Sequence, residues 1–571
     1  IRIGTRYRAN RLNGPYDAIV IGSGISGGWA AKELSEKGLK TLVLERGHHV
    51  EHIRDYQGEH QPPWHYRFRD YGDRKLHEKD YPIQSKFGWF NDHNKQFWNN
   101  DRLNPYVQAD GKPFNWVRAD ALGGRSILWG RQCYRWSDLD FEANKRDGHG
   151  IDWPIRYKDI EPWYSYVEKY AGISGQAEGL PQLPDGEFLK PMPMNSVEKH
   201  VKAAIEENYP GRVMTIGRVA VLTEPHNGRA PCHYCGPCHY GCSTASYFCS
   251  LTTTLPAAKA TGNVTIRPDS VVERLETDPK TGRVTGVDVI DANTKERHRF
   301  TGRIVFLCAS AIGSTQILMN SKSERHPNGL ANGSGALGRY LMDHTFATGV
   351  GGVMPGFLDR NTIGQRPNGI YIPRFRNLDG QDGDANFLRG YGFQGGARRE
   401  GWNRDVPGFG RDFKDAVSKP GPWVMYMSGF GEILPYADNQ VTLDEKKVDR
   451  FGIPQVHVSV EYKDNEKKMI DDIMARGTEM LKAAGATNVH AWPGPMIMGS
   501  GVHEMGTARM GHDPATSVLN GWNQAHEVPN LFVTDGACMT SGSCVNPSIT
   551  YMAITARAAS HAAELVRAGT I

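Results

Sequence analysis

The sequence predicts an α/β protein with two parts: a discontinuous Rossmann-like domain and an α+β domain built on an antiparallel sheet. A short apolar run at residues 17–21, Asp-Ala-Ile-Val-Ile, stands directly before the pattern Gly-Ser-Gly-Ile-Ser-Gly at 22–27. Short β-branched runs of this kind form buried parallel strands. Residues 441–443 and 455–460 alternate apolar and polar side chains, as strands with one packed face do.

The glycine pattern G-x-G-x-x-G belongs to a strand–turn–helix unit. Residues 26–37 carry Ala, Leu and charged side chains at helical spacing, and Gly38 is placed to end that helix. Residues 39–44 then predict a second strand, which ends at Glu45. In such a unit the glycines permit a tight turn, let the backbone approach a pyrophosphate and pack helix against strand. An acid at the end of the second strand accepts from a ribose hydroxyl, so the unit predicts a site for NAD or FAD.

The composition excludes several classes of protein. The chain of 571 residues has 67 Lys and Arg against 63 Asp and Glu. It therefore lacks the excess of positive charge that is typical of nucleic-acid-binding proteins. The apolar fraction of 39% supports a large core and excludes a disordered chain. We expect no transmembrane helix, because no run of about 18 apolar residues occurs. Residues 1–13 lack the hydrophobic core of a signal peptide. The glycine-rich stretch 352–421 is expected to form loops.

A cysteine cluster lies in the middle of the chain. Five of the nine cysteines fall between residues 232 and 249, and four of these have the spacing C-x2-C-x2-C-x3-C. This spacing is typical of ferredoxin-type iron–sulfur ligands, and soft thiolates select iron–sulfur centres or zinc. The four candidate metal ligands are Cys232, Cys235, Cys238 and Cys242.

The kind of site at these cysteines stays open from spacing alone. Ser243 stands where the ferredoxin run has proline, and the fourth cysteine of such a run can serve another centre. A [3Fe–4S] cluster held by three of the four cysteines fits the spacing as well as a [4Fe–4S] cluster does, and we slightly favour [3Fe–4S]. A zinc site that uses His233 or His239, and a pair of disulfides, are the alternatives. The other cysteines are expected to be small buried residues, namely Cys133, Cys249, Cys308, Cys538 and Cys544.

Further motifs follow in order along nearly the whole chain. They include a glycine-rich loop, a D-W-P-I segment, an A-S-A-I-G-S turn, a G-x-x-L-x-D-H segment, an H-E-M-G-T segment, a T-D-G turn and an N-P-S turn. They occupy, in this order, residues 122–130, 152–155, 309–314, 338–344, 503–507, 534–536 and 546–548. Strands are expected at 264–266, 272–275 and 531–533, and a last helix is expected at 549–568. Together these segments resemble the glucose–methanol–choline (GMC) oxidoreductases, a family that binds FAD.

The resemblance implies FAD as the cofactor and a set of residues that bind it. These are Gly22, Gly24, Ser26, Gly27, Glu45, Arg46, Gly123, Gly124, Ser126, Trp129, Gly130, Val272, Asp535, Gly536 and Pro547. Trp129 stands where the family's flavin loop usually has Asn, and the common oxidases lack the cysteine run. Both features resemble the branch of sugar, gluconate and glucoside dehydrogenases. Members of that branch carry an iron–sulfur centre, and the comparison favours Cys232, Cys238 and Cys242 as its surest ligands.

The resemblance also places a catalytic pair. Alcohol oxidation needs a base for the hydroxyl proton, and histidine has a suitable pKa. The family's base is the histidine of the H-x-x-G-T segment, which is His503 here, and the residue that orients the alcohol is Asn546. The motif H-E-x-x-H of zinc proteases is excluded, because residue 507 is Thr. His344 and His512 receive no catalytic role.

The resemblance implies a sugar or glycoside substrate that is oxidised at a secondary hydroxyl, with C3 as the first choice. A sugar or sugar-acid dehydrogenase acting at C1 or C2 and an oxygen-using GMC alcohol oxidase are the alternatives. The resemblance implies a small chaperone-like subunit, a cytochrome c-type or quinone acceptor and a periplasmic location, with membrane association through partner subunits as a further option. The expected domains are FAD-binding at 16–60, 111–144, 227–339 and 501–571, substrate-binding at 153–225 and 341–498, and a lid or interface at 61–110.

Overall fold

The computed structural model describes residues 15–59, 61–70 and 72–571. A five-stranded parallel sheet, in the order β19-β11-β1-β2-β7, forms the centre of the dinucleotide-binding part. Its strands are β1 (Tyr16–Ile21), β2 (Thr41–Leu44), β7 (Val264–Arg267), β11 (Gly302–Leu307) and β19 (Leu531–Val533). Segments far apart in the sequence therefore meet in one sheet, and the predicted strand–turn–helix unit and the strand at 531–533 are confirmed.

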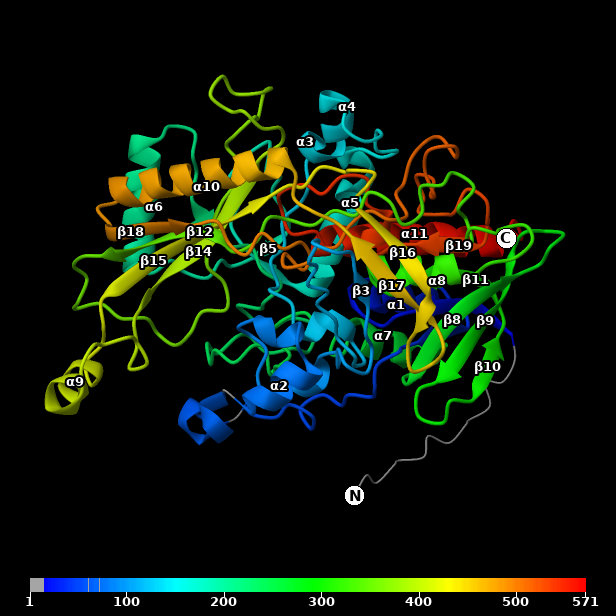
Figure 1. Ribbon diagram of the computed structural model, residues 1–571, viewed down its shortest axis with the longest axis horizontal. Helices are drawn as coiled ribbons and strands as arrows, with labels where there is room; N and C mark the ends of the chain where they lie inside the picture. Colours follow the sequence, from blue (N-terminus) through cyan, green and yellow to red (C-terminus); the bar gives the residue numbers. More distant parts are fainter. Residues whose placement is uncertain (1–14, 60, 71) are drawn as a thin grey trace.

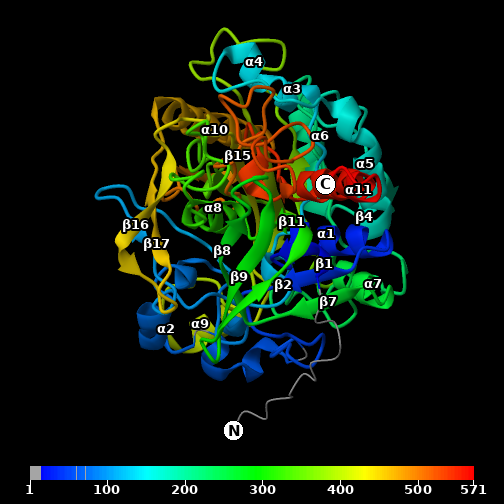
Figure 2. The ribbon, with the colours of Figure 1, turned by 90° about the vertical axis from the view of Figure 1, so that its right-hand side faces the viewer.

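Both faces of this sheet are covered, which explains its continuous apolar strands. Ala18 and Val20 pack with the helices α1 (Ile25–Glu36) and α11 (Ser548–Arg567). Ile19 and Ile21 pack on the other side, against α8 (Ala311–Asn320) and a three-stranded antiparallel sheet. That sheet has the order β10-β9-β8 and consists of β8 (Ser270–Thr277), β9 (Val284–Asp291) and β10 (Arg297–Phe300). Figure 2 shows α11 crossing beside α5 (Tyr157–Ala171) next to the parallel sheet.

A six-stranded antiparallel sheet, β18-β12-β15-β14-β13-β6, forms the other half of the molecule (Figure 1). Its strands are β6 (Thr215–Ile216), β12 (Thr348–Met354), β13 (Ile370–Ile372), β14 (Tyr391–Arg399), β15 (Trp423–Gly431) and β18 (Thr487–Trp492). The helix α10 (Asp464–Ala483) packs on β12, β15 and β18, and α6 (Ser196–Asn208) lies beside α10. An antiparallel sheet is present as expected, but the strands expected at 441–443 and 455–460 belong to a separate three-stranded sheet. The domain boundaries stay a prediction.

The expectation of loops over residues 352–421 is wrong for part of this stretch. β13 and β14 lie within it and are central strands of the six-stranded sheet. A Cβ atom on Gly369 would lie 1.8 Å from the carbonyl oxygen of Gly395, and one on Gly395 would lie 2.0 Å from the carbonyl oxygen of Tyr426. Glycine is required here because neighbouring backbones approach too closely for any side chain. The glycine-rich composition therefore concealed strands that pack against one another.

The remaining elements are short or peripheral. β16 (Gln440–Val448) pairs with β17 (Pro454–Ser459), and β17 also pairs with β3 (Val107–Gln108). α9 (Gly410–Val417) projects from the molecule with no buried residue (Figure 1). The others are α2 (Arg74–Asp80), α3 (Asp138–Phe141), α4 (Ala143–Asp147), α7 (Thr254–Ala260), β4 (Ile173–Ser174) and β5 (Phe188–Leu189). Among the helices of the described residues, none is long and apolar enough to span a lipid bilayer.

Candidate active site

A cavity of about 900 Å³ lies between the carboxyl ends of the parallel strands and the inner surface of the six-stranded sheet. Ile21, Leu44 and Cys308, at or just after the ends of three parallel strands, line one side of it. Gln394 of β14 and Ser428 of β15 line the other side. Ligands of open α/β sheets bind outside the carboxyl ends of the strands, so the cavity has the place and size of a ligand site.

The first glycine turn shapes one end of the cavity. Gly22 has a φ of +100°, which favours glycine. A Cβ on Gly27 would lie 1.9 Å from the carbonyl oxygen of Gly22, whereas one on Gly24 would meet no atom within 4 Å. Gly27 is therefore needed for helix packing, and Gly24 leaves open space beside the backbone. α1 begins after Gly24 with no side-chain cap and no acid in its first turn, so its free amides can bind an anion.

Glu45 ends β2 beside this turn. Its carboxylate accepts from the amide of Ser23 at 2.9 Å, from the hydroxyl of Ser23 at 2.5 Å and from the amide of Gly47 at 2.7 Å. The Ser23 hydroxyl also accepts from the amide of Gly123 at 2.9 Å. These bonds hold the acid, the first turn and the second glycine-rich loop together, and Glu45 still lines the cavity.

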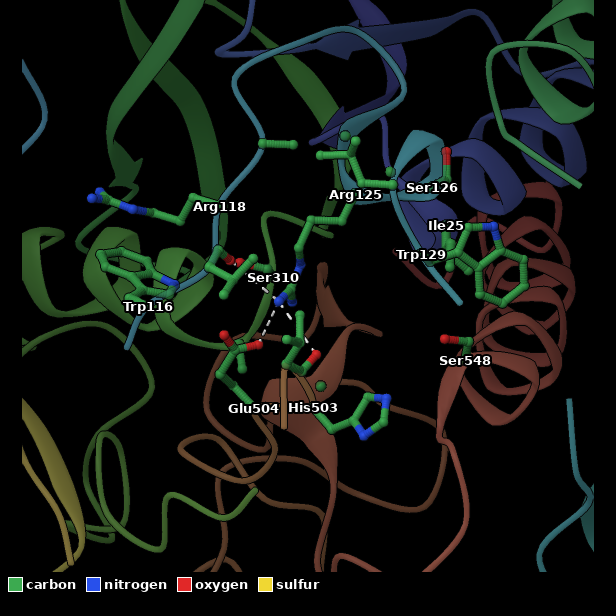
Figure 3. Close-up of a pocket in the computed structure, with 18 of the residues that line it drawn as sticks. Ile25, Trp116, Arg118, Arg125, Ser126, Trp129, Ser310, His503, Glu504 and Ser548 are labelled. Carbon is green, nitrogen blue, oxygen red and sulfur yellow. Dashed lines mark hydrogen bonds and ion pairs between the residues drawn. The ribbon is translucent and has the colours of Figure 1, made fainter. Parts of the chain in front are cut away.

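The second loop, at residues 122–130, folds over the first turn. Gly123 and Gly124 have φ of +96° and +53°, and a Cβ on Gly124 would lie 3.2 Å from the Cα of Gly24. The Ser126 hydroxyl donates to the carbonyl of Gly123 at 2.5 Å. Trp129 donates its indole N–H to the carbonyl of Phe248 at 2.9 Å and presents its ring to the cavity (Figure 3).

Most of the predicted cofactor residues line this cavity. They are Gly22, Gly24, Ser26, Glu45, Arg46, Gly124, Ser126, Trp129, Gly130, Val272, Asp535 and Gly536. Gly27, Gly123 and Pro547 do not line it. Asp535 accepts from the hydroxyl of Ser314 at 2.5 Å and from the amide of Ala537 at 2.9 Å, and burial raises its pKa to about 6.

The two predicted catalytic residues meet on the cavity wall. The Nδ2 atom of Asn546 lies 3.3 Å from the Nε2 atom of His503. On the far side of the ring, His503 Nδ1 lies 2.7 Å from Nδ1 of His344, whose Nε2 lies 2.8 Å from the carbonyl oxygen of Ser543. Burial lowers the pKa of His503 well below its ordinary value, helped by His344 and the positive charge of Arg125. The ring of His503 is therefore neutral near pH 7 and able to accept a proton.

Charged groups surround the backbone of His503. The carboxylate of Asp343 accepts from the amides of Gly499, Gly501 and His503 at 2.8, 3.0 and 3.0 Å. Burial, with the nearby Glu504 carboxylate, raises the pKa of Asp343 to about 7. Arg125 donates to Glu504 at 2.8 Å, and Figure 3 shows this ion pair beside His503.

Comparison with known proteins gives this arrangement a family. Models of the GMC oxidoreductases match residues 16–346 and 435–555. The chain belongs to the GMC oxidoreductase family. It is 30% identical over 566 residues to the 2-methyl-1,2-propanediol dehydrogenase of Mycolicibacterium austroafricanum, covering 95% of this chain and 94% of that protein. It is 25% identical over 554 residues to the fructose dehydrogenase large subunit of Gluconobacter japonicus, covering 95% and 97%.

The fold agrees with that assignment. The formate oxidase of Aspergillus oryzae superposes with a TM-score of 0.61 at 14% identity, covering 98% of this chain and 100% of the other. GMC oxidoreductases bind FAD and act on CH–OH groups. The cavity of this family member fits FAD, because the uncapped helix end and the open space at Gly24 suit a pyrophosphate and the buried Glu45 suits a ribose.

The four clustered cysteines of this GMC oxidoreductase line a second, small cavity of about 10 Å³. All nine cysteines are free, which argues against the disulfide alternative. His233 lines the small cavity, whereas His239 lines the large one and stacks on Trp89. By donor chemistry the thiols fit a thiolate-held centre. Among the described residues, however, no three or more His, Cys, Asp or Glu side chains are arranged to hold a metal ion.

Several residues at the active site escaped the sequence reasoning. His344 received no catalytic role, yet it contacts His503 directly. Arg125 and Glu504 lie inside recognised motifs and gave no signal of their ion pair. Gln394 donates to Asn546 from a strand that the glycine-rich composition had hidden. His344 lies inside the motif at 338–344, so of these four residues only Gln394 lies outside every motif that the sequence offered.

Proposed function

We propose that this GMC oxidoreductase is a dehydrogenase that oxidises a secondary hydroxyl of a sugar or glycoside, with C3 as the preferred carbon. The observation that supports this most directly is the contact of His503 with Asn546 on a cavity wall that also includes the dinucleotide turn. A base and an amide that face the same space can hold one hydroxyl group near a flavin. No other part of the cavity brings a neutral histidine and an amide this close in the described residues.

The two side chains divide the handling of the hydroxyl. His503 Nε2 accepts the hydroxyl proton, and Asn546 Nδ2 donates a hydrogen bond to the hydroxyl oxygen. Bound FAD supplies the acceptor of the hydride that leaves the same carbon, so the alcohol becomes a ketone. His503 is uncharged at neutral pH and therefore starts in the form that accepts a proton. Asn546 does not ionise and cannot compete for that proton.

The substrate end of the cavity combines aromatic and polar side chains. The aromatic members are Trp89, Phe346, Tyr426, Phe430 and Trp492, and the polar members include Gln132, Arg366, Asn368, Gln394 and Ser428. Rings offer flat apolar surface and amides offer paired donors and acceptors, which suits a polyhydroxylated ring. The names of the diol and fructose dehydrogenases that the chain resembles support a polyol or sugar.

We propose also that Cys232, Cys238 and Cys242, with Cys235 as the candidate for a fourth ligand, hold an iron–sulfur centre. Such a centre would pass electrons singly to a cytochrome c-type or quinone acceptor. Support comes from the shared cavity of four free thiols and from Arg131 and Pro367, which line both this cavity and the large one. The two cavities are therefore neighbours.

Partner subunits and a periplasmic location complete the proposal. The fructose dehydrogenase relative is named as a large subunit, which supports a multi-subunit enzyme. A small chaperone-like subunit and a cytochrome are the partners that the dehydrogenase branch implies. This part is tested separately by co-purifying the chain with the proteins that its neighbouring genes encode. Haem staining then shows whether a cytochrome is among them.

Anaerobic mixing of the purified flavoprotein with a panel of glycosides, sugars and sugar acids tests the reaction. We expect bleaching of the flavin by glycosides, and a ketone at C3 in the product by NMR. His503→Ala should keep its FAD while flavin reduction slows by about 100- to 10,000-fold, the usual worth of a general base. Normal reduction in this variant would remove His503 from the role. Oxidation at C1 or C2 would favour the sugar-acid alternative, and rapid peroxide formation in air would favour an oxidase.

A further inference from the structure

A continuous line of hydrogen-bonded side chains runs through the catalytic pair, from a backbone carbonyl at one end to a side chain of the strand β14 at the other. It begins at the carbonyl oxygen of Ser543 and passes through His344, His503 and Asn546 to Gln394. His344 and Gln394 themselves are not the residues that contact the reacting hydroxyl in the proposed function. Their place in the line gives each of them a separate task.

We infer that His344 and Gln394 are positioning residues that fix which atom of His503 accepts a proton and which atom of Asn546 donates one. The inference rests on the proposed function of His503 and Asn546. It concerns the protonation pattern of the line, which can be measured whether or not a substrate is known.

The Ser543 carbonyl fixes the first proton. A carbonyl oxygen only accepts, so His344 Nε2, 2.8 Å away, must carry a hydrogen. Burial lowers the pKa of His344 to about 4, so its ring is neutral near pH 7 and its Nδ1 atom has a lone pair. The 2.7 Å contact between the two Nδ1 atoms is then a hydrogen bond only if His503 Nδ1 donates.

The proton on Nδ1 decides the chemistry of His503. A neutral imidazole with hydrogen on Nδ1 has its lone pair on Nε2. Nε2 is the atom that faces Asn546 and the cavity. The two rings are 4.9 Å apart and inclined by 81°, so the in-plane nitrogen atoms meet without ring stacking. The opposite tautomer would place two lone pairs 2.7 Å apart and leave no acceptor toward the substrate.

Gln394 fixes the other end of the line. Its Nε2 donates to Oδ1 of Asn546 from the middle of β14. Because Oδ1 is engaged, the Nδ2 donor of Asn546 faces His503 and the cavity. The hydroxyl of a substrate would then find a donor for its oxygen at Asn546 and an acceptor for its hydrogen at His503. With the other tautomer of His503, an N–H group would face the hydroxyl hydrogen. With the Asn546 amide turned over, a carbonyl oxygen would face the hydroxyl oxygen.

Four variants test the line. His344→Gln keeps one acceptor and one donor near the original positions, whereas His344→Leu removes both. Gln394→Glu keeps the shape but replaces the donor with acceptors, so it should reverse the Asn546 amide. His326→Gln is the matched control, because His326 is also buried but lies outside the cavity. All four holoenzymes are compared for FAD content before any rate is measured.

The first measurement is the tautomer. Nitrogen-15 NMR of histidine-labelled holoenzyme, assigned with His503→Ala, should show hydrogen on Nδ1 of His503 in the unaltered protein. It should show a mixture of tautomers in His344→Leu. Hydrogen on Nε2 in the unaltered protein would overturn the inference. This result would leave the proposed function standing, because His503→Ala tests that function separately.

The second measurement is the rate constant of anaerobic flavin reduction at saturating substrate. We expect His344→Leu and Gln394→Glu to lose about 100-fold or more, within the range of general-base catalysis. His344→Gln should recover most of that loss, and His326→Gln should not differ from the unaltered enzyme. Equal losses in His344→Gln and His344→Leu would show that the site needs the shape of histidine and not its hydrogen-bond polarity, and would also overturn the inference.

Discussion

Gly24 and Gly27 occupy the same turn, and the structure predicts opposite consequences for a methyl group at each. In Gly27→Ala the new Cβ would lie 1.9 Å from the carbonyl oxygen of Gly22. This is about 1 Å closer than carbon and oxygen tolerate, so α1 must move away from β1. Overpacking of this kind costs about 1–3 kcal/mol of folding free energy. The cost is present with and without FAD, because both contacting atoms belong to the protein.

In Gly24→Ala the new Cβ would meet no protein atom within 4 Å. The backbone of Gly24 is extended, with a negative φ of −66°, so it lies outside the left-handed region that favours glycine. The free energy of unfolding of the apoprotein should therefore change by less than about 0.5 kcal/mol. The methyl group fills the space beside the free amides of α1, however. Loss of one charge-assisted hydrogen bond to a phosphate, worth about 1.5–3 kcal/mol, weakens FAD binding by roughly 10- to 150-fold.

Thermal unfolding of both variants, with and without added FAD, separates the two effects. Gly27→Ala should unfold at a lower temperature in both conditions. Gly24→Ala should match the unaltered apoprotein and gain less stability from a given concentration of FAD, since that gain depends on the ratio of ligand concentration to Kd. Flavin absorbance gives the bound fraction directly. Equal destabilisation of the two apoproteins, or full FAD affinity in Gly24→Ala, would contradict this prediction.

Two further predictions concern the reaction and the cysteines. Because burial holds the pKa of His503 well below 6.5, the rate constant of flavin reduction should stay constant from about pH 8 to about pH 6.5 and fall only at lower pH. Burial raises the pKa of Asp343 to about 7. If the rate constant measured by stopped flow fell with a midpoint near pH 7, the titration of Asp343 would set the pH dependence of flavin reduction instead. Cys238→Ser should lower the iron content and the electron paramagnetic resonance signal of the purified protein, while flavin content stays the same. Cys235→Ser is its matched control, because Cys235 is the exposed member of the four, and equal loss in both variants would make Cys235 a ligand.

The dinucleotide turn was predictable because its chemistry is local. β1, the turn and α1 occupy residues 16–36, and two of the glycine requirements arise inside this segment: the positive φ of Gly22 and the contact between Gly27 and the carbonyl oxygen of Gly22. The strand at 531–533 was also predictable, since its short apolar run is bounded by the turn at 534–536, a pattern that favours a buried strand. The strands β13 and β14 were not, because glycine lowers the strand signal at the very positions where backbones approach most closely.

The catalytic environment depends on contacts between distant residues, and this limited the sequence reasoning. His344 and His503 are 159 residues apart, and Gln394 and Asn546 are 152 apart. No periodicity or spacing rule links such positions, so the motifs gave the base and its amide partner but not the residues behind them. The cysteine run is the opposite case. Its spacing brought four thiols to one small cavity, as expected, but spacing cannot specify the directions of the thiols that a metal requires.

The adjacent residues Asp343 and His344 explain how one short segment can control a base so far along the chain. The carboxylate of Asp343 accepts three backbone amides of residues 499–503, and this fixes the main chain that carries His503. His344, the next residue, contacts the ring of His503 itself. One segment therefore holds both the backbone and the imidazole, and a shift of this segment would move both together. For a reaction that needs a lone pair aimed at one hydroxyl group, such coupling preserves the direction of Nε2 as the surrounding loops move.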